Sequence, residues 1–158
     1  MNIFVLHTDP VKAAKMQCDK HVVKMVLETA QLLCTAHYLS GETSPNFYKP
    51  THKSHPCTKW AANSSSNYKW LYEHFTALCD EYAHRYGKTH LSDKKLREAL
   101  QTEPVNILQS KMEQWPLAMT SSPECIKDSV VESYRAYYKT KRDKFKMVWT
   151  KRDVPSWF

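Results

Sequence analysis

Polar and apolar residues recur with a helical period over residues 19–39. Five polar residues return at steps of three or four: His21, Lys24, Glu28, Gln31 and Thr35. At about 100° per residue, they fall within an arc of roughly 80° on one side of a helix. The other sides carry mainly aliphatic residues: Val22, Val23, Val26, Leu27, Ala30, Leu33 and Cys34. The pattern therefore predicts a long helix that is apolar over most of its circumference.

This polar stripe is the first candidate functional feature. A helix that is apolar on most sides is usually buried. Burying a cation, a carboxylate, an imidazole and an amide together costs free energy unless they bind each other or a ligand. The alternative is a solvated face, but such a face would be dominated by Glu and Lys rather than by His, Gln and Thr. The composition of the stripe favours a pocket.

The remaining pattern predicts further helices and few strands. Residues 3–6 predict a short strand or extended segment, and Pro56 and Gly87 mark the start and end of another long helix. A serine run at 64–66 predicts a bend in it. The other predicted helices span residues 11–17, 92–101 and 127–149, and the connections span 41–53 and 102–124. The chain has two glycines in 158 residues, which argues against a turn-rich β protein. We expect a mainly α fold with one domain over residues 1–158.

Composition limits the cellular setting. No apolar run approaches the roughly 20 residues that span a bilayer. Residues 1–6 are apolar but too short for a signal peptide, and they lack a basic region, so we expect a cytoplasmic protein. The five cysteines form no CxxC motif and no Cys/His pair at zinc spacing, which predicts reduced, mostly buried thiols. We expect no cofactor.

The charge is positive and concentrated late in the chain. Net charge is +7 at pH 7, and only Asp143 interrupts the basic residues between Lys139 and Arg152. Aromatic residues are threaded through this run, as in segments that bind nucleic acid. The alternative is a solvated helix face. If the run binds a polyanion, the contacts are expected from Lys139, Lys141, Arg142 and Lys144.

A second candidate site precedes Pro56. Tyr48, Lys49, His52 and His55 lie just before the predicted start of a helix, where an anion is favoured. We interpret these residues as phosphate or carboxylate ligands. The two histidines could instead hold a metal, but no third ligand is evident.

Three further candidate residues lie in the helix predicted from Pro56 to residue 86 or just after its end. Asn67 shares a face with Trp60 and Leu71, where an amide is either a satisfied core residue or a reader of a base edge. Arg85 and Lys88 lie in a cation-rich helix end. Positive charge there often only complements the helix dipole, and the other hypothesis is substrate binding.

The pattern around the stripe resembles the phage pyrimidine-dimer glycosylases called endonuclease V. That family carries Asp-x-His and a catalytic glutamate seven positions after the histidine, which matches Asp19, His21 and Glu28. Its next helix resembles this chain at His55, the aromatic run 60–75, Glu81 and 85–87. Tyr48-Lys49 and His55-Pro56 are similar to an element of bacterial relatives. The resemblance covers about residues 1–90. The segment 18–25, Cys-Asp-Lys-His-Val-Val-Lys-Met, also resembles a family of small phage proteins.

The resemblance implies a compact helical protein that binds kinked DNA and attacks the sugar C1′ with its N-terminal α-amine, assisted by the glutamate. This chain departs from that pattern: Asn2 stands where the family exposes a threonine amine, and Gln31 stands where it has a basic residue. Lys24 could replace the amine as a Schiff-base lysine, or Glu28 could activate water. We predict a phage-type protein that cleaves an N-glycosidic bond in DNA or a nucleotide. The alternative is a non-catalytic nucleotide- or nucleic-acid-binding protein that uses the same pocket.

Overall fold

The computed structural model describes residues 1–158 and contains helices and no strands. The mainly α fold predicted from the sequence is confirmed. The α-helices are α1 (Pro10–Lys15), α2 (Asp19–Leu39), α3 (Pro56–Asn63), α4 (Ser65–Tyr86), α5 (Leu91–Leu96) and α6 (Val130–Lys139). Two short 3-10 helices, η1 (Pro123–Cys125) and η2 (Thr140–Asp143), flank α6. No helix combines the length and the apolar character that crossing a bilayer requires.

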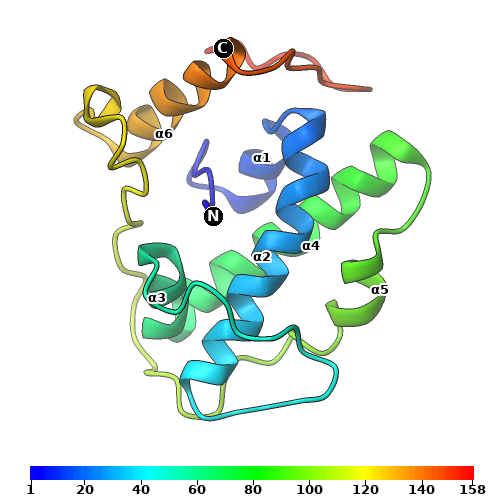
Figure 1. Cartoon of the computed structure of the whole chain (residues 1–158), viewed down its shortest axis with the longest axis vertical. Coiled ribbons are helices and arrows are strands. Elements are labelled where there is room, and N and C mark those ends of the chain that lie inside the picture. Colours follow the sequence, from blue (N-terminus) through cyan, green and yellow to red (C-terminus); the bar gives the residue numbers. More distant parts are fainter.

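Helix α2 is at the centre of the molecule. It packs against α3, α4 and α5, while α1 packs against α4 (Figure 1). Fully buried side chains from α2, α4 and α6, among them Leu33, Leu71 and Tyr134, belong to one continuous core of 32 residues. All five cysteines are buried free thiols. The predicted 19–39 helix is confirmed with its boundaries, although Val23 and Leu27 on its apolar sides are 39% and 40% exposed.

The helix predicted from Pro56 to residue 86 is two helices. Ser64 has an extended backbone, and its hydroxyl accepts the Asn67 N–H at 3.1 Å, so it caps α4 and ends α3. The sequence predicted only a bend at this serine run, whereas the structure has a break, because a serine that caps a new helix ends the preceding one. Gly87 ends α4 in the left-handed conformation with φ 66°, as predicted. The predicted 92–101 helix is shorter and begins earlier, because the His90 side chain caps it.

The helix predicted over residues 127–149 ends ten residues early. Ser129 caps α6, and the chain tightens into η2 after Lys139. The following tail does not continue the helix, because it is held across the start of α2. Asp19 donates its backbone N–H to the Val148 carbonyl, and its carboxylate accepts the Thr150 N–H and hydroxyl at 2.9 and 2.6 Å. Tertiary hydrogen bonds therefore override the local helical pattern.

Residues 1–6 form no strand, and residues 2–6 are buried. The segment lies between α2 and α6 (Figure 1). Asn2 fixes it, because its side chain accepts the Phe4 N–H and donates to the Ala118 carbonyl. Phe4 has φ 42°, an uncommon conformation for a bulky residue. Arg135 of α6 donates to the Leu6 carbonyl at 2.9 Å, which ties α6 to this segment.

Candidate active site

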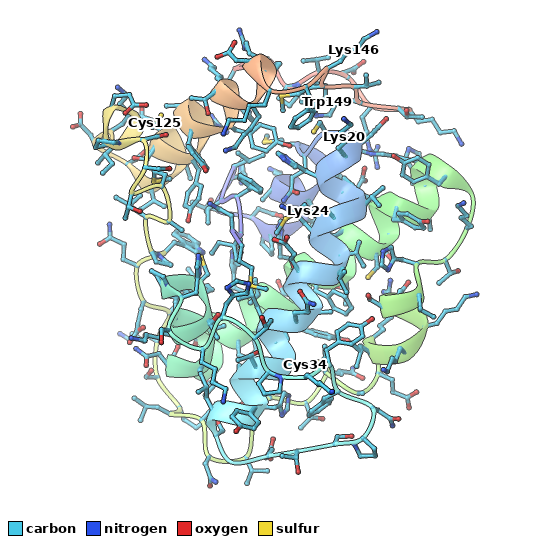
Figure 2. All side chains as sticks on the ribbon, in the orientation of Figure 1. Lys20, Lys24, Cys34, Cys125, Lys146 and Trp149 are labelled. Carbon is cyan, nitrogen blue, oxygen red and sulfur yellow. The ribbon has the colours of Figure 1, made fainter.

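A cavity of about 240 Å³ lies between α2, the N-terminal segment and the α6 region. Its lining residues are Met1, Asn2, Phe4, His21, Lys24, Met25, Glu28, Ala118, Tyr137 and Lys141. Figure 2 shows Lys20 and Lys24 on the end of α2 that lies beneath the C-terminal tail. The first three residues of the predicted stripe, His21, Lys24 and Glu28, therefore share one cavity.

Glu28 is the only carboxylate in this cavity. Its side chain is 17% exposed, and its Oε1 atom lies 3.2 Å from Lys24 Nζ. Its Oε2 atom is buried and has no hydrogen-bond partner within the chain. A buried carboxylate oxygen without a donor is unfavourable in the free protein. It is therefore available to a ligand that brings a donor or a positive charge.

His21 is held as a neutral imidazole. Burial, followed by the charges of Lys24 and Lys141, lowers the pKa of His21 to about 4. The Tyr138 hydroxyl accepts the Cys18 N–H and lies 2.8 Å from His21 Nδ1. Because this hydroxyl is buried and has no other acceptor, it donates its hydrogen to Nδ1. The ring proton of His21 is then on Nε2. The ring also stacks on Phe4, with centroids 4.7 Å apart.

His55 borders the same region from the loop before α3. Its Nδ1 atom accepts the Cys57 N–H at 3.1 Å and caps α3. Burial and the nearby α-amine of Met1 lower the pKa of His55, while the Met1 backbone and the Glu28 carboxylate oppose this shift. His55 therefore lies close to both Met1 and Glu28. His52 is exposed, and its ring centroid lies 6.5 Å from that of His55. No group of three or more His, Cys, Asp or Glu side chains is arranged to hold a metal ion.

Thr35, at the far end of the stripe, contacts a loop instead of the cavity. The Thr35 hydroxyl donates to the Gln31 carbonyl at 2.7 Å and accepts the Thr51 N–H at 3.2 Å. Thr35 thus anchors the loop that carries His52 and His55, and neither Thr35 nor Gln31 lines the cavity. The predicted stripe divides into a cavity half and a loop-anchoring half.

Tyr48 and Lys49 lie in a separate depression of about 200 Å³, together with Cys34, Tyr38 and Phe47. The Tyr48 hydroxyl is 2.8 Å from Ser92 Oγ, so it joins the loop to α5. The predicted phosphate site of Tyr48, Lys49, His52 and His55 is therefore not one cluster. Of these four residues, His55 alone approaches Glu28.

Asn67 and Arg85 are structural residues. The Asn67 amide donates to the Trp60 carbonyl and to Glu113, and accepts the Glu113 N–H, which is the satisfied-core alternative. Arg85 is fully buried and donates to Glu81, Asp19 and two backbone carbonyls. Its donors are therefore occupied within the chain, and a substrate contact of Arg85 stays a prediction. Lys88 is exposed in the loop after α4 and does not line the cavity.

The four basic residues predicted to contact nucleic acid separate into two groups. Lys139, Arg142 and Lys144 are exposed. Lys141 is 9% exposed and lines the cavity. Sequence reasoning also missed Phe4, Ala118, Tyr137 and Tyr138. The aromatic character of Phe4, Tyr137 and Tyr138 was visible, but no local signal connects them or Ala118 with His21.

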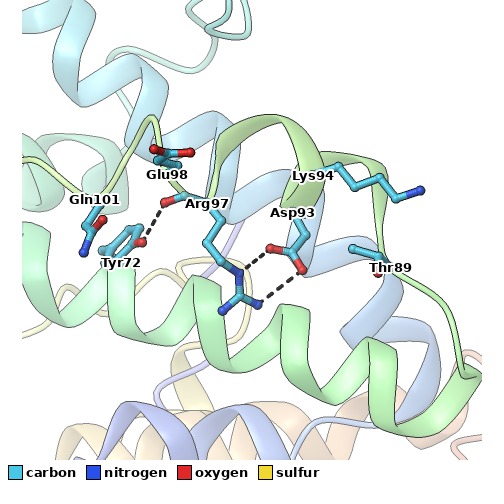
Figure 3. Close-up of a pocket in the computed structure, with 7 residues that line it drawn as sticks. All are labelled: Tyr72, Thr89, Asp93, Lys94, Arg97, Glu98 and Gln101. Carbon is cyan, nitrogen blue, oxygen red and sulfur yellow. Dashed lines mark hydrogen bonds and ion pairs between the residues drawn. The ribbon is translucent and has the colours of Figure 1, made fainter.

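The largest depression, about 610 Å³, is remote in the fold from Glu28. It is a polar hollow along α4 and α5 (Figure 3). Arg97 pairs with Asp93 and Asp80, and Tyr72 donates to the Arg97 carbonyl. These groups satisfy one another, so the hollow lacks the unpartnered polar atom that distinguishes the Glu28 cavity.

The chain is thus a small helical protein whose carboxylate–histidine cavity lies against its central helix α2. The family of pyrimidine dimer DNA glycosylases matches residues 1–95, and the chain belongs to this family. The matched region includes α1 to α4, and residues 96–158 lie outside it. No curated protein and no solved structure matches the chain.

Proposed function

We propose that this protein cleaves an N-glycosidic bond of a nucleotide unit in DNA, with Glu28 as the central carboxylate and His21 and Lys24 beside it. The observation that carries the proposal is the unpartnered, buried Oε2 atom of Glu28 in a cavity. Departure of a base leaves positive charge on the sugar, and a carboxylate that lacks other partners stabilises it. Membership of a DNA glycosylase family supports DNA as the substrate.

The attacking group is either an amine or water. Lys24 is 60% exposed, and its Nζ atom is held by Glu28 at 3.2 Å, so its amine is partly turned to solvent and is not free in the cavity. Met1 lines the cavity and lies near His55. Met1 is therefore a better amine candidate than Lys24. Water activated by Glu28 is the route without an imine.

The first experiment looks for base release. The protein is incubated with damaged, modified and normal DNA and with free nucleotides, and released bases are measured by chromatography. We expect release from at least one DNA substrate. No release from any of them, together with retained nucleotide binding, would support the non-catalytic alternative.

The second experiment identifies the nucleophile. Borohydride reduces an imine to a stable adduct, which peptide mapping assigns to Met1 or Lys24. Lys24→Gln and the exposed Lys59→Gln are the matched variants. An adduct at Met1 that persists in Lys24→Gln supports amine attack from the N-terminal segment. Base release without any adduct supports attack by water, and an adduct at Lys24 would contradict the argument from its exposure.

A further inference from the structure

Lys141 is a buried cation without an acidic partner. It lies in η2, is 9% exposed and lines the cavity that contains Glu28. Its Nζ atom is 3.7 Å from the centroid of the Tyr137 ring, and it forms no ion pair and no hydrogen bond within the chain. The side chain is mostly buried but its Nζ atom stays accessible, so the ammonium group keeps hydrogens open to acceptors beside the cation–π contact.

Arg85 is a buried cation whose charge is compensated by partners within the chain. Both residues are at least nine-tenths buried, but Arg85 donates to two carboxylates and two carbonyls. Lys141 has an aromatic face and an open cavity instead. Its three ammonium hydrogens are therefore available to a ligand with acceptor oxygens.

A second donor points to the same end of the cavity. His21 uses Nδ1 to accept from Tyr138, which leaves the Nε2–H as its free donor. Lys24 and Lys141 both lie near enough to act electrostatically on His21. The cavity thus holds two lysines against the single carboxylate of Glu28. An excess of positive charge, with N–H donors from two elements, favours an anion with several acceptor oxygens.

We propose that Lys141 and His21 form a phosphate subsite, at the end of the cavity away from Glu28, that holds a phosphate of the nucleotide whose glycosidic bond is cleaved. His21 and Glu28 are seven residues apart on α2, which is about 10 Å along the helix axis. A phosphate bound at His21 therefore lies away from the Glu28 carboxylate, so the two negative charges do not face each other. The subsite selects phosphate-bearing substrates over free nucleosides.

The subsite depends on the part of the chain outside the family match. Lys141 and Tyr137 lie beyond residue 95, whereas His21 and Glu28 lie within the match. The inference deepens the proposed function, since it names the substrate class of the same cavity. Phosphate binding by itself does not require that function, so the two can be tested apart.

The direct test measures binding of inorganic phosphate by calorimetry. The variants are Lys141→Met, which keeps the length but removes the charge, Lys141→Arg, which keeps the charge, and the exposed Lys59→Met as a control. Because Lys141→Met loses hydrogen bonds from a charged group to phosphate, we expect it to bind phosphate about tenfold or more weakly. Lys59→Met should match the parent, and Lys141→Arg should retain most of the affinity.

A measurement on the unmodified protein guards against a folding defect in Lys141→Met. Phosphate should shift the ¹⁵N resonances of Lys141 Nζ and His21 Nε2 in a saturable manner. No saturable shift at either nitrogen, or equal phosphate affinity in the parent and in a folded Lys141→Met, would overturn the subsite.

A competition experiment with three kinds of ligand distinguishes the source of the phosphate. Short oligonucleotides, deoxynucleoside monophosphates and nucleosides are compared as competitors of phosphate binding in the parent and in Lys141→Met. Competition by oligonucleotides alone assigns the subsite to a phosphodiester, and competition by monophosphates assigns it to a free nucleotide phosphate. Nucleosides that compete as strongly as either would contradict it. If phosphate binding depends on Lys141 but no base is ever released, the proposed function fails and the subsite stands.

Discussion

At the scale of single residues, the buried polar side chains separate into those that the chain satisfies and those that it leaves open. Arg85 and Asn67 are fully paired, whereas Glu28 and Lys141 are not. The sequence predicted that His21, Lys24 and Glu28 share a face, because the helical period alone determines it. It could not separate Arg85 from Glu28 by role, since apart from Glu81 the partners of Arg85 lie 66–70 residues away along the chain.

The two most perturbed histidines predict acid sensitivity. Burial lowers the pKa of both His21 and His74 to about 4, below the ordinary 6.5. Their neutral forms stabilise the fold above pH 6.5, and this contribution is lost as pH falls from about 6.5 to about 4. Each histidine contributes up to roughly 3 kcal/mol across that window. Urea denaturation at several pH values should show this loss, and His74→Gln should reduce its slope. A free energy of unfolding that does not change between about pH 6.5 and about pH 4 would contradict the account.

At the scale of elements, the sequence predicted helix ends that depend on a single residue, but it did not predict ends that depend on contacts between distant segments. Pro56 and Gly87 begin and end helices where the sequence predicted, because each acts through its own backbone. The early end of α6 was not predictable, since Asp19 fixes Thr150 from the other end of the chain. The same kind of contact joins α6 to α2 through Tyr138.

Tyr138→Phe tests this connection between α6 and α2. The variant removes the hydroxyl that accepts from Cys18 and donates to His21. Leaving a buried N–H without a partner costs about 1–3 kcal/mol, so we expect a loss of that size in the free energy of unfolding. Tyr137→Phe is the matched control, because the Tyr137 hydroxyl makes no hydrogen bond within the chain. Equal stability of the two variants would show that the Tyr138 hydroxyl does not join the elements.

At the scale of the whole molecule, two parts of the chain close over one cavity. Residues 1–95 match the glycosylase family and contribute Glu28 and His21. The later residues contribute Ala118, Tyr137 and Lys141 to the wall, and their exposed cations lie on the outside. Within the C-terminal basic run, Lys141 thus lines the cavity while Lys139 and Lys144 are exposed, a division that the charge pattern alone did not reveal.

The external cations predict salt-dependent DNA binding. Each phosphate contact adds a slope of about −0.9 to a plot of log affinity against log salt for duplex DNA. Charge reversal of Lys139 and Lys144 should weaken binding and reduce this slope. Lys94→Glu, an exposed reversal on α5, is the control and should leave the slope near that of the parent. Unchanged slopes in all variants would place DNA elsewhere on the surface.

The most direct test of the central claim compares base release by the parent and by Glu28→Gln under single-turnover conditions, with the exposed Glu73→Gln as control. The amide keeps the shape of the side chain but not its charge. We predict that Glu28→Gln retains DNA affinity and loses base release by about a hundredfold or more, while Glu73→Gln matches the parent. Base release at the parental rate by a folded Glu28→Gln would contradict the account.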